Sequence, residues 1–215
     1  MQEGKIDGRR VRGDQSRRAV LARAIQIAST DGLEGLSIAR LASEVEASKS
    51  GVAALFGSKE QLQLATIEAA RALFMDVVID PVRAYPKGAG RVARLVRTWL
   101  DYSERRVFDG GCFFLAVSAE FDSHPGPVRD EIARAIADRD SYFIRTIDHA
   151  IAAGELPNCS DAEQLAFELT ALVETANSRS LISGSSAPYG RAARAAATRL
   201  EAAGAETRVL DLLST

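Results

Sequence analysis

A stretch of small and basic side chains between residues 48 and 56 has the spacing of one short helix. Leu55 and Phe56 follow Val52 by three and four residues, which predicts one buried face. The side chains left on the other face are those of Ser48, Lys49, Ser50, Ala53 and Ala54. Such a face suits the major groove of DNA, because small side chains let the helix backbone approach base edges, hydroxyls exchange hydrogen bonds there, and alanine methyls contact thymine methyls.

Basic side chains flank this face at positions suited to phosphate. Lys49 lies within the predicted helix, and Lys59 follows Ser58, which with Gln61 forms a capping box at the start of the next helix. The N-terminal amides of a helix and a lysine ammonium together form a phosphate site. Arg40 lies on the outward side of its own predicted helix, where a phosphate contact and a surface ion pair both remain open.

Three helices must position these side chains. The apolar spacing predicts helices over 15–30, 38–45 and 49–55, with a turn at Glu46 and Ala47 between the last two. Two brief helices braced by a longer one describe a helix-turn-helix. Residues 1–14, rich in arginine and glycine, predict a disordered basic arm, which either contacts DNA or is a solvated tail.

The rest of the chain has helical spacing almost everywhere, so the sequence predicts an all-α protein of about nine helices. Pro81 is expected to stop the helix that starts at Ser58. Residues 112–121 are apolar on nearly every side and predict a helix buried all round. The remaining predicted helices cover 91–107, 128–153, 160–182 and 191–203.

Composition limits the function classes. The chain has 215 residues, 47% of them hydrophobic, and a formal net charge of −2, while residues 1–28 hold seven basic and three acidic side chains, so any basic surface is local. No apolar run reaches the roughly 18 residues of a membrane span, and no signal peptide is recognisable, so a cytoplasmic location without membrane attachment is expected. No catalytic motif, zinc pattern or cofactor fingerprint is present, so we expect no enzyme activity, metal or cofactor.

Aromatic side chains in the second half of the chain predict either core or the wall of an apolar ligand pocket. Glu120 either caps a helix or orients a ligand, and Cys112 is either a small buried hydrophobe or a thiol sensor. The candidate pocket residues are Phe74, Trp99, Tyr102, Cys112, Phe113, Phe114, Glu120 and Phe143.

Three segments of the N-terminal region carry a family resemblance. The sequence reads DGLEGLSI at 31–38, SKSG at 48–51 and FGSKEQL at 56–62, and this order resembles the DNA-binding domain of TetR-family transcriptional regulators. Gly-Gly-Cys at 110–112 and Pro-Gly-Pro-Val-Arg-Asp at 125–130 resemble the C-terminal domain of one subgroup.

The resemblance implies a homodimeric repressor that binds a palindromic double-stranded DNA operator and is released by a small apolar or amphipathic effector. It implies a DNA-binding domain over 15–60 and a ligand-binding and dimerisation domain over 61–215, with the last two long helices forming the dimer interface. The DNA-contacting set it implies is Ser37, Arg40, Ser48, Lys49, Ser50, Gly51, Ala53, Ala54 and Lys59.

One departure from the family pattern concerns Ala53 and Ala54, where relatives often have aromatic or histidine side chains that contact phosphate. Phosphate anchoring is then expected from Ser37, Arg40, Lys49, Lys59 and the basic arm. The alternative is a helical small-molecule-binding or scaffold protein that has lost DNA binding.

Overall fold

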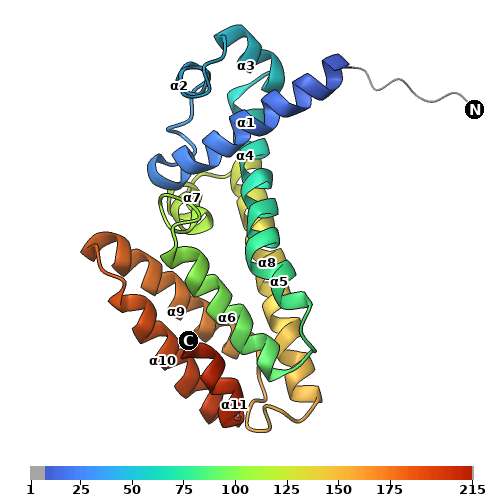
Figure 1. Cartoon of the computed structure of the whole chain (residues 1–215), viewed down its shortest axis with the longest axis vertical. Coiled ribbons are helices and arrows are strands. Elements are labelled where there is room, and N and C mark those ends of the chain that lie inside the picture. Colours follow the sequence, from blue (N-terminus) through green and yellow to red (C-terminus); the bar gives the residue numbers. More distant parts are fainter. Residues whose placement is uncertain (1–7, 215) are drawn as a thin grey trace, which may run out of the picture.

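The computed structural model describes residues 8–214, and these form helices and connecting loops without a β-strand (Figure 1). The predicted all-α class is confirmed. Nine of the α-helices have seven or more residues: α1 (Gly8–Asp31), α2 (Ile38–Glu44), α3 (Lys49–Phe56), α4 (Lys59–Phe74), α6 (Ala89–Glu104), α7 (Phe113–Phe121), α8 (Pro127–Ala152), α9 (Ala162–Ser183) and α10 (Ala187–Ala202). The shorter segments are the π-helical turn η1 (Met75–Ile79), α5 (Asp80–Arg83), α11 (Thr207–Leu210) and the 3₁₀ turn η2 (Asp211–Leu213).

The helices α1, α2 and α3 form a small head at one end of the molecule (Figure 1). Ser37 and Ser48 cap α2 and α3, because each hydroxyl oxygen accepts a backbone N–H three residues on, from Arg40 at 3.1 Å and from Gly51 at 3.0 Å. Val52 is 1% exposed and anchors α3 to the head core. The serine caps therefore fix the two short helices that the sequence predicts.

The first helix begins earlier than predicted. Its backbone is helical from Gly8, so the prediction of disorder is wrong for 8–14, while 1–7 lie outside the described residues. Gly13 costs a helix only about 1 kcal/mol relative to alanine, and the arginines around it are good helix formers, so the glycine does not end the helix.

The helix that starts at Lys59 also continues past its predicted stop. It passes through η1 into α5 and ends at Arg83, with Pro81 inside α5. A proline in a regular α-helix removes one hydrogen bond and clashes with the carbonyl four residues before it. The wider π-helical turn ends at Ile79, two residues before Pro81, and changes this spacing so that Pro81 lies at the start of α5, where a proline is tolerated.

The body is built around α6, whose apolar side chains are buried against α8, α9 and η1. The helix α4 runs from the head along α8, and α9 lies beside α10 (Figure 1). The C-terminal turns α11 and η2 pack against α6, with Leu213 2% exposed. The long α4 thus connects the head to the body, where it packs against α8.

The helix α7 is less buried than its composition predicts. Phe113, Phe114 and Val117 are buried, but Leu115 is half-buried and Ala119 is exposed. The expectation of burial all round is therefore wrong, because one side of α7 lies at the surface next to α9.

Candidate nucleic-acid interface and ligand cavity

The outer face of α3 carries the side chains that the sequence assigns to DNA. Of the predicted DNA-contacting set, two residues, Arg40 and Ala53, are half-buried. The exposed members are Ser37, Ser48, Lys49, Ser50, Gly51, Ala54 and Lys59. The face is accessible and lies at the end of the molecule (Figure 1).

The absence of a side chain at Gly51 has a local structural cause, in addition to allowing the close approach of DNA that the sequence predicts. A Cβ atom there would lie 2.9 Å from Ser48 Oγ, the atom that caps α3. The Ser48 hydroxyl also lies 3.4 Å from Ser50 Oγ. Ser48 therefore caps α3 through its hydroxyl oxygen. Its hydroxyl proton can still be donated to another group.

Two predicted phosphate ligands are paired within the head. Arg40 Nη2 lies 2.6 Å from Asp31 Oδ2, and Lys59 Nζ lies 2.7 Å from Glu34 Oε2 and 3.0 Å from the Glu34 carbonyl oxygen. The hydrogen bond from Arg40 lowers the pKa of Asp31, and those from Lys59 and then Gln63 lower the pKa of Glu34. For Arg40 the ion-pair alternative holds in this structure, so a phosphate would have to compete with carboxylates at both basic groups.

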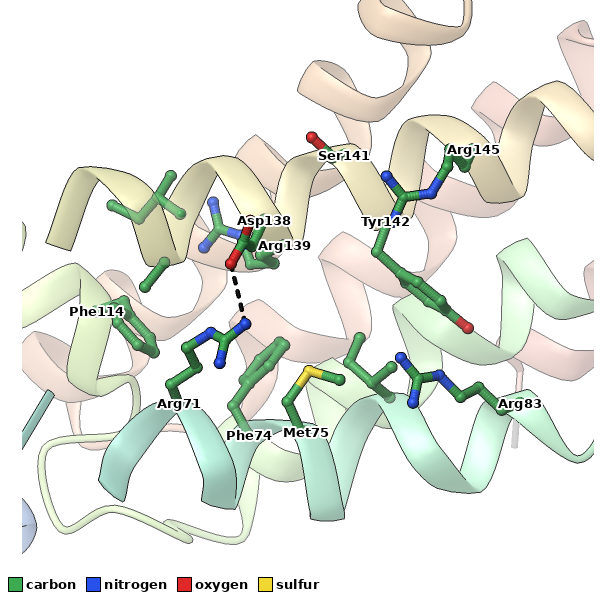
Figure 2. A pocket seen from close by; sticks show the side chains of 13 residues that line it. Arg71, Phe74, Met75, Arg83, Phe114, Asp138, Arg139, Ser141, Tyr142 and Arg145 are labelled. Atoms are coloured by element: carbon green, nitrogen blue, oxygen red, sulfur yellow. Dashed lines mark hydrogen bonds and ion pairs between the residues drawn. The ribbon is translucent and has the colours of Figure 1, made fainter. Parts of the chain in front are cut away.

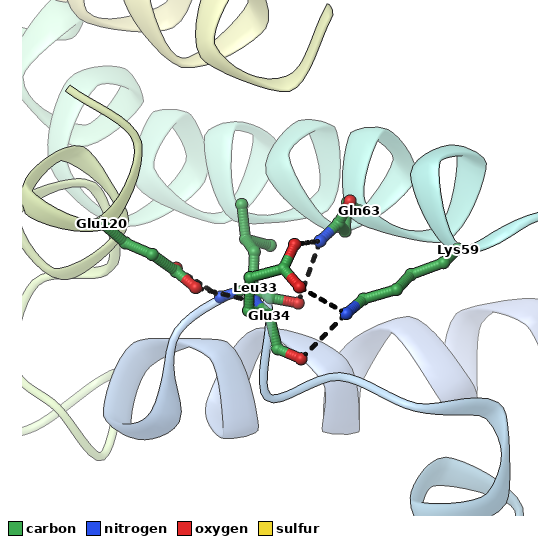
Figure 3. Close-up of polar contacts among 5 residues, drawn as sticks. All are labelled: Leu33, Glu34, Lys59, Gln63 and Glu120. Atoms are coloured by element: carbon green, nitrogen blue, oxygen red, sulfur yellow. Dashed lines mark hydrogen bonds and ion pairs between the residues drawn. The ribbon is translucent and has the colours of Figure 1, made fainter. Parts of the chain in front are cut away.

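Glu120 connects the body to the head. Its carboxylate, carried by α7, accepts the backbone N–H groups of Leu33 at 2.7 Å and Glu34 at 2.8 Å (Figure 3). From α4, Gln63 donates to the Leu33 carbonyl oxygen at 3.2 Å and to Glu34 Oε1 at 3.0 Å. The sequence predicts that Glu120 caps a helix or orients a ligand, whereas in this structure its carboxylate binds two N–H groups of the loop after α1.

A second junction joins α1 to the loop before α7. Gln26 donates to the Val107 carbonyl oxygen at 3.0 Å and accepts the Asp109 N–H at 2.9 Å, and Ser29 Oγ accepts the Gly110 N–H at 3.0 Å. A Cβ atom at Gly110 would clash with the Ser29 carbonyl oxygen. The sequence analysis names Gly110 only as part of the Gly-Gly-Cys resemblance and missed Gln26 and Ser29, since nothing in their spacing distinguishes them from other polar positions of α1.

A cavity of about 320 Å³ lies between α8 and the continuous helix α4–η1–α5 (Figure 2). Phe74 and Phe114 are the members of the predicted pocket set that line it. The full lining is Arg71, Phe74, Met75, Ile79, Arg83, Phe114, Ala135, Ile136, Asp138, Arg139, Ser141, Tyr142 and Arg145. Sequence reasoning missed its arginines, because a charged residue every few positions along a helix is also the pattern of a solvated face.

The other predicted pocket aromatics belong to the core of the body. Trp99, Tyr102, Phe113 and Phe143 are at most 1% exposed. The Phe74 ring meets the rings of Trp99 and Tyr102 edge-on, each with centroids 5.5 Å apart, and Trp99 also lies 5.7 Å from Phe143. The pocket prediction for these four residues is therefore corrected to core packing. Phe74 both lines the cavity and contacts Trp99 and Tyr102.

Cys112 lies in the protein interior, 2% exposed. Burial raises the pKa of its thiol, which disfavours the reactive thiolate. Both cysteines are free thiols. Cys112 thus fits the interpretation as a small buried hydrophobe.

Two features are absent from residues 8–214, the part of the chain that the structure describes. Among these residues, no three His, Cys, Asp or Glu side chains gather as a metal would require. None of the described helices combines the length and apolar character of a membrane span.

Large apolar side chains are exposed on α9. Phe167 is 68% exposed and Ile182 is 89% exposed, and Leu181 beside it is 43% exposed. Small residues such as Ala171 on α9 and Ala195 on α10 continue the surface. We call this surface, with Leu115 of α7 at its edge, the α9–α10 face. Exposed apolar surface of this kind is a candidate interaction site.

Comparison with known proteins points to one family. The model of the tetracycline repressor-like C-terminal domain matches residues 88–196. No curated protein matches the sequence.

Solved structures share the fold. A TetR transcriptional regulator from Chloroflexus aurantiacus J-10-FL superposes with a TM-score of 0.82 at 24% identity, over 89% of this chain and 96% of that one. A TetR-family regulator from Cytophaga hutchinsonii gives 0.77 at 20% identity, over 91% and 97%. AibR, crystallised with isovaleryl coenzyme A and operator DNA, gives 0.64 at 21% identity, over 75% and 85%.

The matched domain spans just over half of the chain, and it begins directly before α6 and ends within α10. The head that precedes it has the two capped short helices and the bracing helix of a helix-turn-helix. The chain therefore belongs to the TetR family, with a helix-turn-helix head and a tetracycline repressor-like C-terminal domain.

Proposed function

We propose that this protein is a transcriptional repressor that binds a palindromic operator as a homodimer and releases it when a small molecule binds the body. The observation that carries the proposal is the exposed outer face of α3, where Lys49, Ser50 and Ala54 stand on a helix fixed by a serine cap. In this proposal residues 15–60 bind DNA and residues 61–215 bind ligand and partner.

Operator contact uses the two kinds of group that the head exposes. Ser50 and Ala54 face base edges in the major groove, and Lys49 binds a backbone phosphate. Arg40 and Lys59 exchange their carboxylate partners, Asp31 and Glu34, for phosphate oxygens when DNA is bound. This exchange limits what the two cations add to affinity, because each existing ion pair has to open.

Dimerisation buries the α9–α10 face. Side chains as exposed as Phe167 and Ile182 are costly in water, and a two-fold axis would place each against the same face of a second copy. Two α3 helices then enter successive major grooves about 34 Å apart, the spacing of one turn of DNA.

Effector release acts through α4. This helix carries Lys59 and Gln63 at the head and Phe74 at the cavity, so a ligand that separates α4 from α8 also moves the contacts to Glu34. A tenfold loss of operator affinity needs only about 1.4 kcal/mol of difference in ligand affinity between the two conformations. AibR, which shares the fold, was crystallised with both a coenzyme A ester and operator DNA, which supports a joint role for the two domains.

The test is a gel shift on the DNA upstream of the protein's own gene. Ala54→Glu places a negative charge on the outer face of α3 and is expected to abolish the shift, while Ala133→Glu, which adds the same charge at an exposed position of α8, is expected to keep it. Equal binding by the two variants would contradict the proposal. Absence of any shift by the unaltered protein would favour the alternative of a ligand-binding protein that no longer binds DNA. The small side chains of Ala53 and Ala54 and the ion pairs of Arg40 and Lys59 would fit that alternative.

A further inference from the structure

The cavity between α4 and α8 joins an apolar wall to a set of guanidinium groups. Arg71, Arg83, Arg139 and Arg145 line it, with one lining carboxylate, Asp138. Arg71 Nη2 lies 3.0 Å from Asp138 Oδ2, and Figure 2 shows this pair spanning the space between α4 and α8. Guanidinium groups bind carboxylate and phosphate through paired hydrogen bonds, so the lining selects for negative charge.

The ion pairs of these arginines differ in how open they are to exchange. Arg139 is held by Asp140 at 2.9 Å and Glu174 at 3.1 Å with a side chain only 10% exposed, so it is a fixed part of the wall. The Arg71 and Asp138 side chains are 33% and 51% exposed, and Arg145 is exposed. An incoming anion can therefore take the place of the Asp138 carboxylate on Arg71.

Three aromatic side chains on or near the apolar side of the cavity carry a polar atom that has no hydrogen-bond partner among the described residues. The Tyr142 hydroxyl on the wall has no hydrogen-bond partner among the described residues, and neither have Trp99 Nε1 and the Tyr102 hydroxyl, which lie behind Phe74. A buried donor without an acceptor costs about 1–3 kcal/mol. Of these groups, the Tyr142 hydroxyl is the one that a polar group of a bound ligand can reach, because Tyr142 lines the cavity.

Phe74 lines the cavity next to a break in the regular helix. It is the last residue of α4, directly before the π-helical turn Met75–Ile79. Turns of this kind interrupt the regular helix and are frequent at functional sites. The cavity volume of about 320 Å³ is at the small end of the roughly 300–1,000 Å³ of known ligand pockets, so a larger ligand has to displace a lining side chain such as Phe74.

From these contacts we infer that the effector is an amphipathic organic anion, whose carboxylate or phosphate group binds Arg71 and whose apolar body enters past Phe74. The inference rests on the proposed role of this cavity as the effector site. It deepens that role by naming the charge and shape of the ligand.

The experiment uses Trp99, the only tryptophan of the chain, as a reporter behind Phe74. The full-length protein is titrated with decanoate, decyl phosphate, decanol and decyltrimethylammonium, each below its micelle-forming concentration, while Trp99 emission is recorded. We expect saturable binding of one or both anions, at least tenfold tighter than that of decanol or the cation. Comparing the affinities of decanoate and decyl phosphate tells which anionic group the site prefers. If decanol binds as tightly as both anions, the inference is overturned.

Two variants of opposite expected effect separate ligand binding from folding. Arg71→Gln is expected to weaken the binding of the preferred anion about tenfold. Asp138→Asn leaves Arg71 with only its longer pair to Glu68, at 3.6 Å, and is expected to tighten that binding about threefold. Arg208→Gln, at an exposed position of α11, is the control and should change nothing. If Arg71→Gln and Asp138→Asn both weaken binding, or neither changes it, Arg71 is only a structural ion-pair partner and the inference fails.

Operator binding is measured separately, in the absence of probe and then with the anion at saturation. Anion binding that depends on Arg71 but leaves the gel shift unchanged upholds the ligand class and contradicts effector release. If the protein binds the operator but its cavity shows no preference for anions, the proposed DNA binding stands and the inferred ligand class is contradicted.

Discussion

The carboxylate of Glu120 accepts the backbone N–H of Glu34 across 86 positions of sequence, at 2.8 Å. The same carboxylate takes the Leu33 N–H, so one side chain of α7 satisfies two neighbouring donors of the loop that follows α1. Hydrogen bonds from N–H groups to an ionised carboxylate are about twice as strong as neutral ones. Glu120 therefore acts together with Gln63 of α4 and the loop before α7 in holding the head on the body.

Replacing Glu120 should loosen this connection without unfolding the protein. In Glu120→Gln the two charge-assisted bonds are lost or weakened, so we expect the Leu33 and Glu34 amides to exchange with solvent at least tenfold faster. Amide hydrogen exchange followed by NMR measures this. Glu201→Gln, on the exposed side of α10, is the matched control, and equal protection in the two variants would show that the Glu120 bonds do not hold the loop.

Gly110 should be intolerant of even one methyl group. Because a Cβ atom there clashes with the Ser29 carbonyl oxygen, Gly110→Ala has to push α1 away from the body. We expect a loss of about 3 kcal/mol in the free energy of unfolding, the upper end for overpacking. Gly13→Ala is the control, since no atom lies within 4 Å of the added carbon and helix propensity predicts a gain of up to about 1 kcal/mol. Urea denaturation gives both values, and similar values for the two variants would refute the close approach.

The Glu34–Lys59 pair should make the head sensitive to acid. Lys59 and Gln63 lower the pKa of Glu34 from its usual 4.5, so the ion pair stabilises the folded state above about pH 4.5 and this contribution is lost as pH falls through the lowered pKa. Lys59→Met should return the pKa of Glu34 toward 4.5 while leaving that of Asp31, which depends on Arg40, unchanged. Carboxyl chemical shifts followed against pH test this, and an unmoved Glu34 titration would be the contrary result.

The α9–α10 face should control the oligomeric state. A charge at the most exposed apolar position, in Ile182→Asp, would be buried without a partner in a two-fold interface, so we expect monomers where the unaltered protein forms dimers. Light scattering after size exclusion gives the mass directly. Ala133→Asp on α8 is the control and should remain dimeric. An Ile182→Asp dimer would place the interface elsewhere.

Cys112 should be inert in the native protein. Because it is buried and its thiol pKa is raised, we expect an aromatic disulfide reagent to react with it only after unfolding in denaturant. Cys159 is also buried, 7% exposed, so a Cys159→Ser variant isolates the signal of Cys112. Rapid reaction of that variant in buffer would revive the thiol-sensor interpretation.

Local sequence was enough to predict the two short helices of the head, though not where α1 begins. The hydroxyl caps at Ser37, Ser48 and Ser58 and the apolar spacing of α2 and α3 are interactions within a few residues, so they are visible without tertiary structure. The same local rules failed at Pro81, where a π-helical turn, which follows no simple spacing, let the helix continue.

The body and its cavity depended on the tertiary structure. The sequence placed Trp99, Phe113 and Phe143 among the candidate pocket residues, because an aromatic side chain looks the same whether it fills a core or lines a pocket. Arg71 and Asp138 are 67 residues apart, and only the packing of α4 against α8 brings them to 3.0 Å. Helix periodicity fixes which face of a helix is apolar, whereas the pairing of faces decides which charges meet, and that pairing is a property of the whole fold.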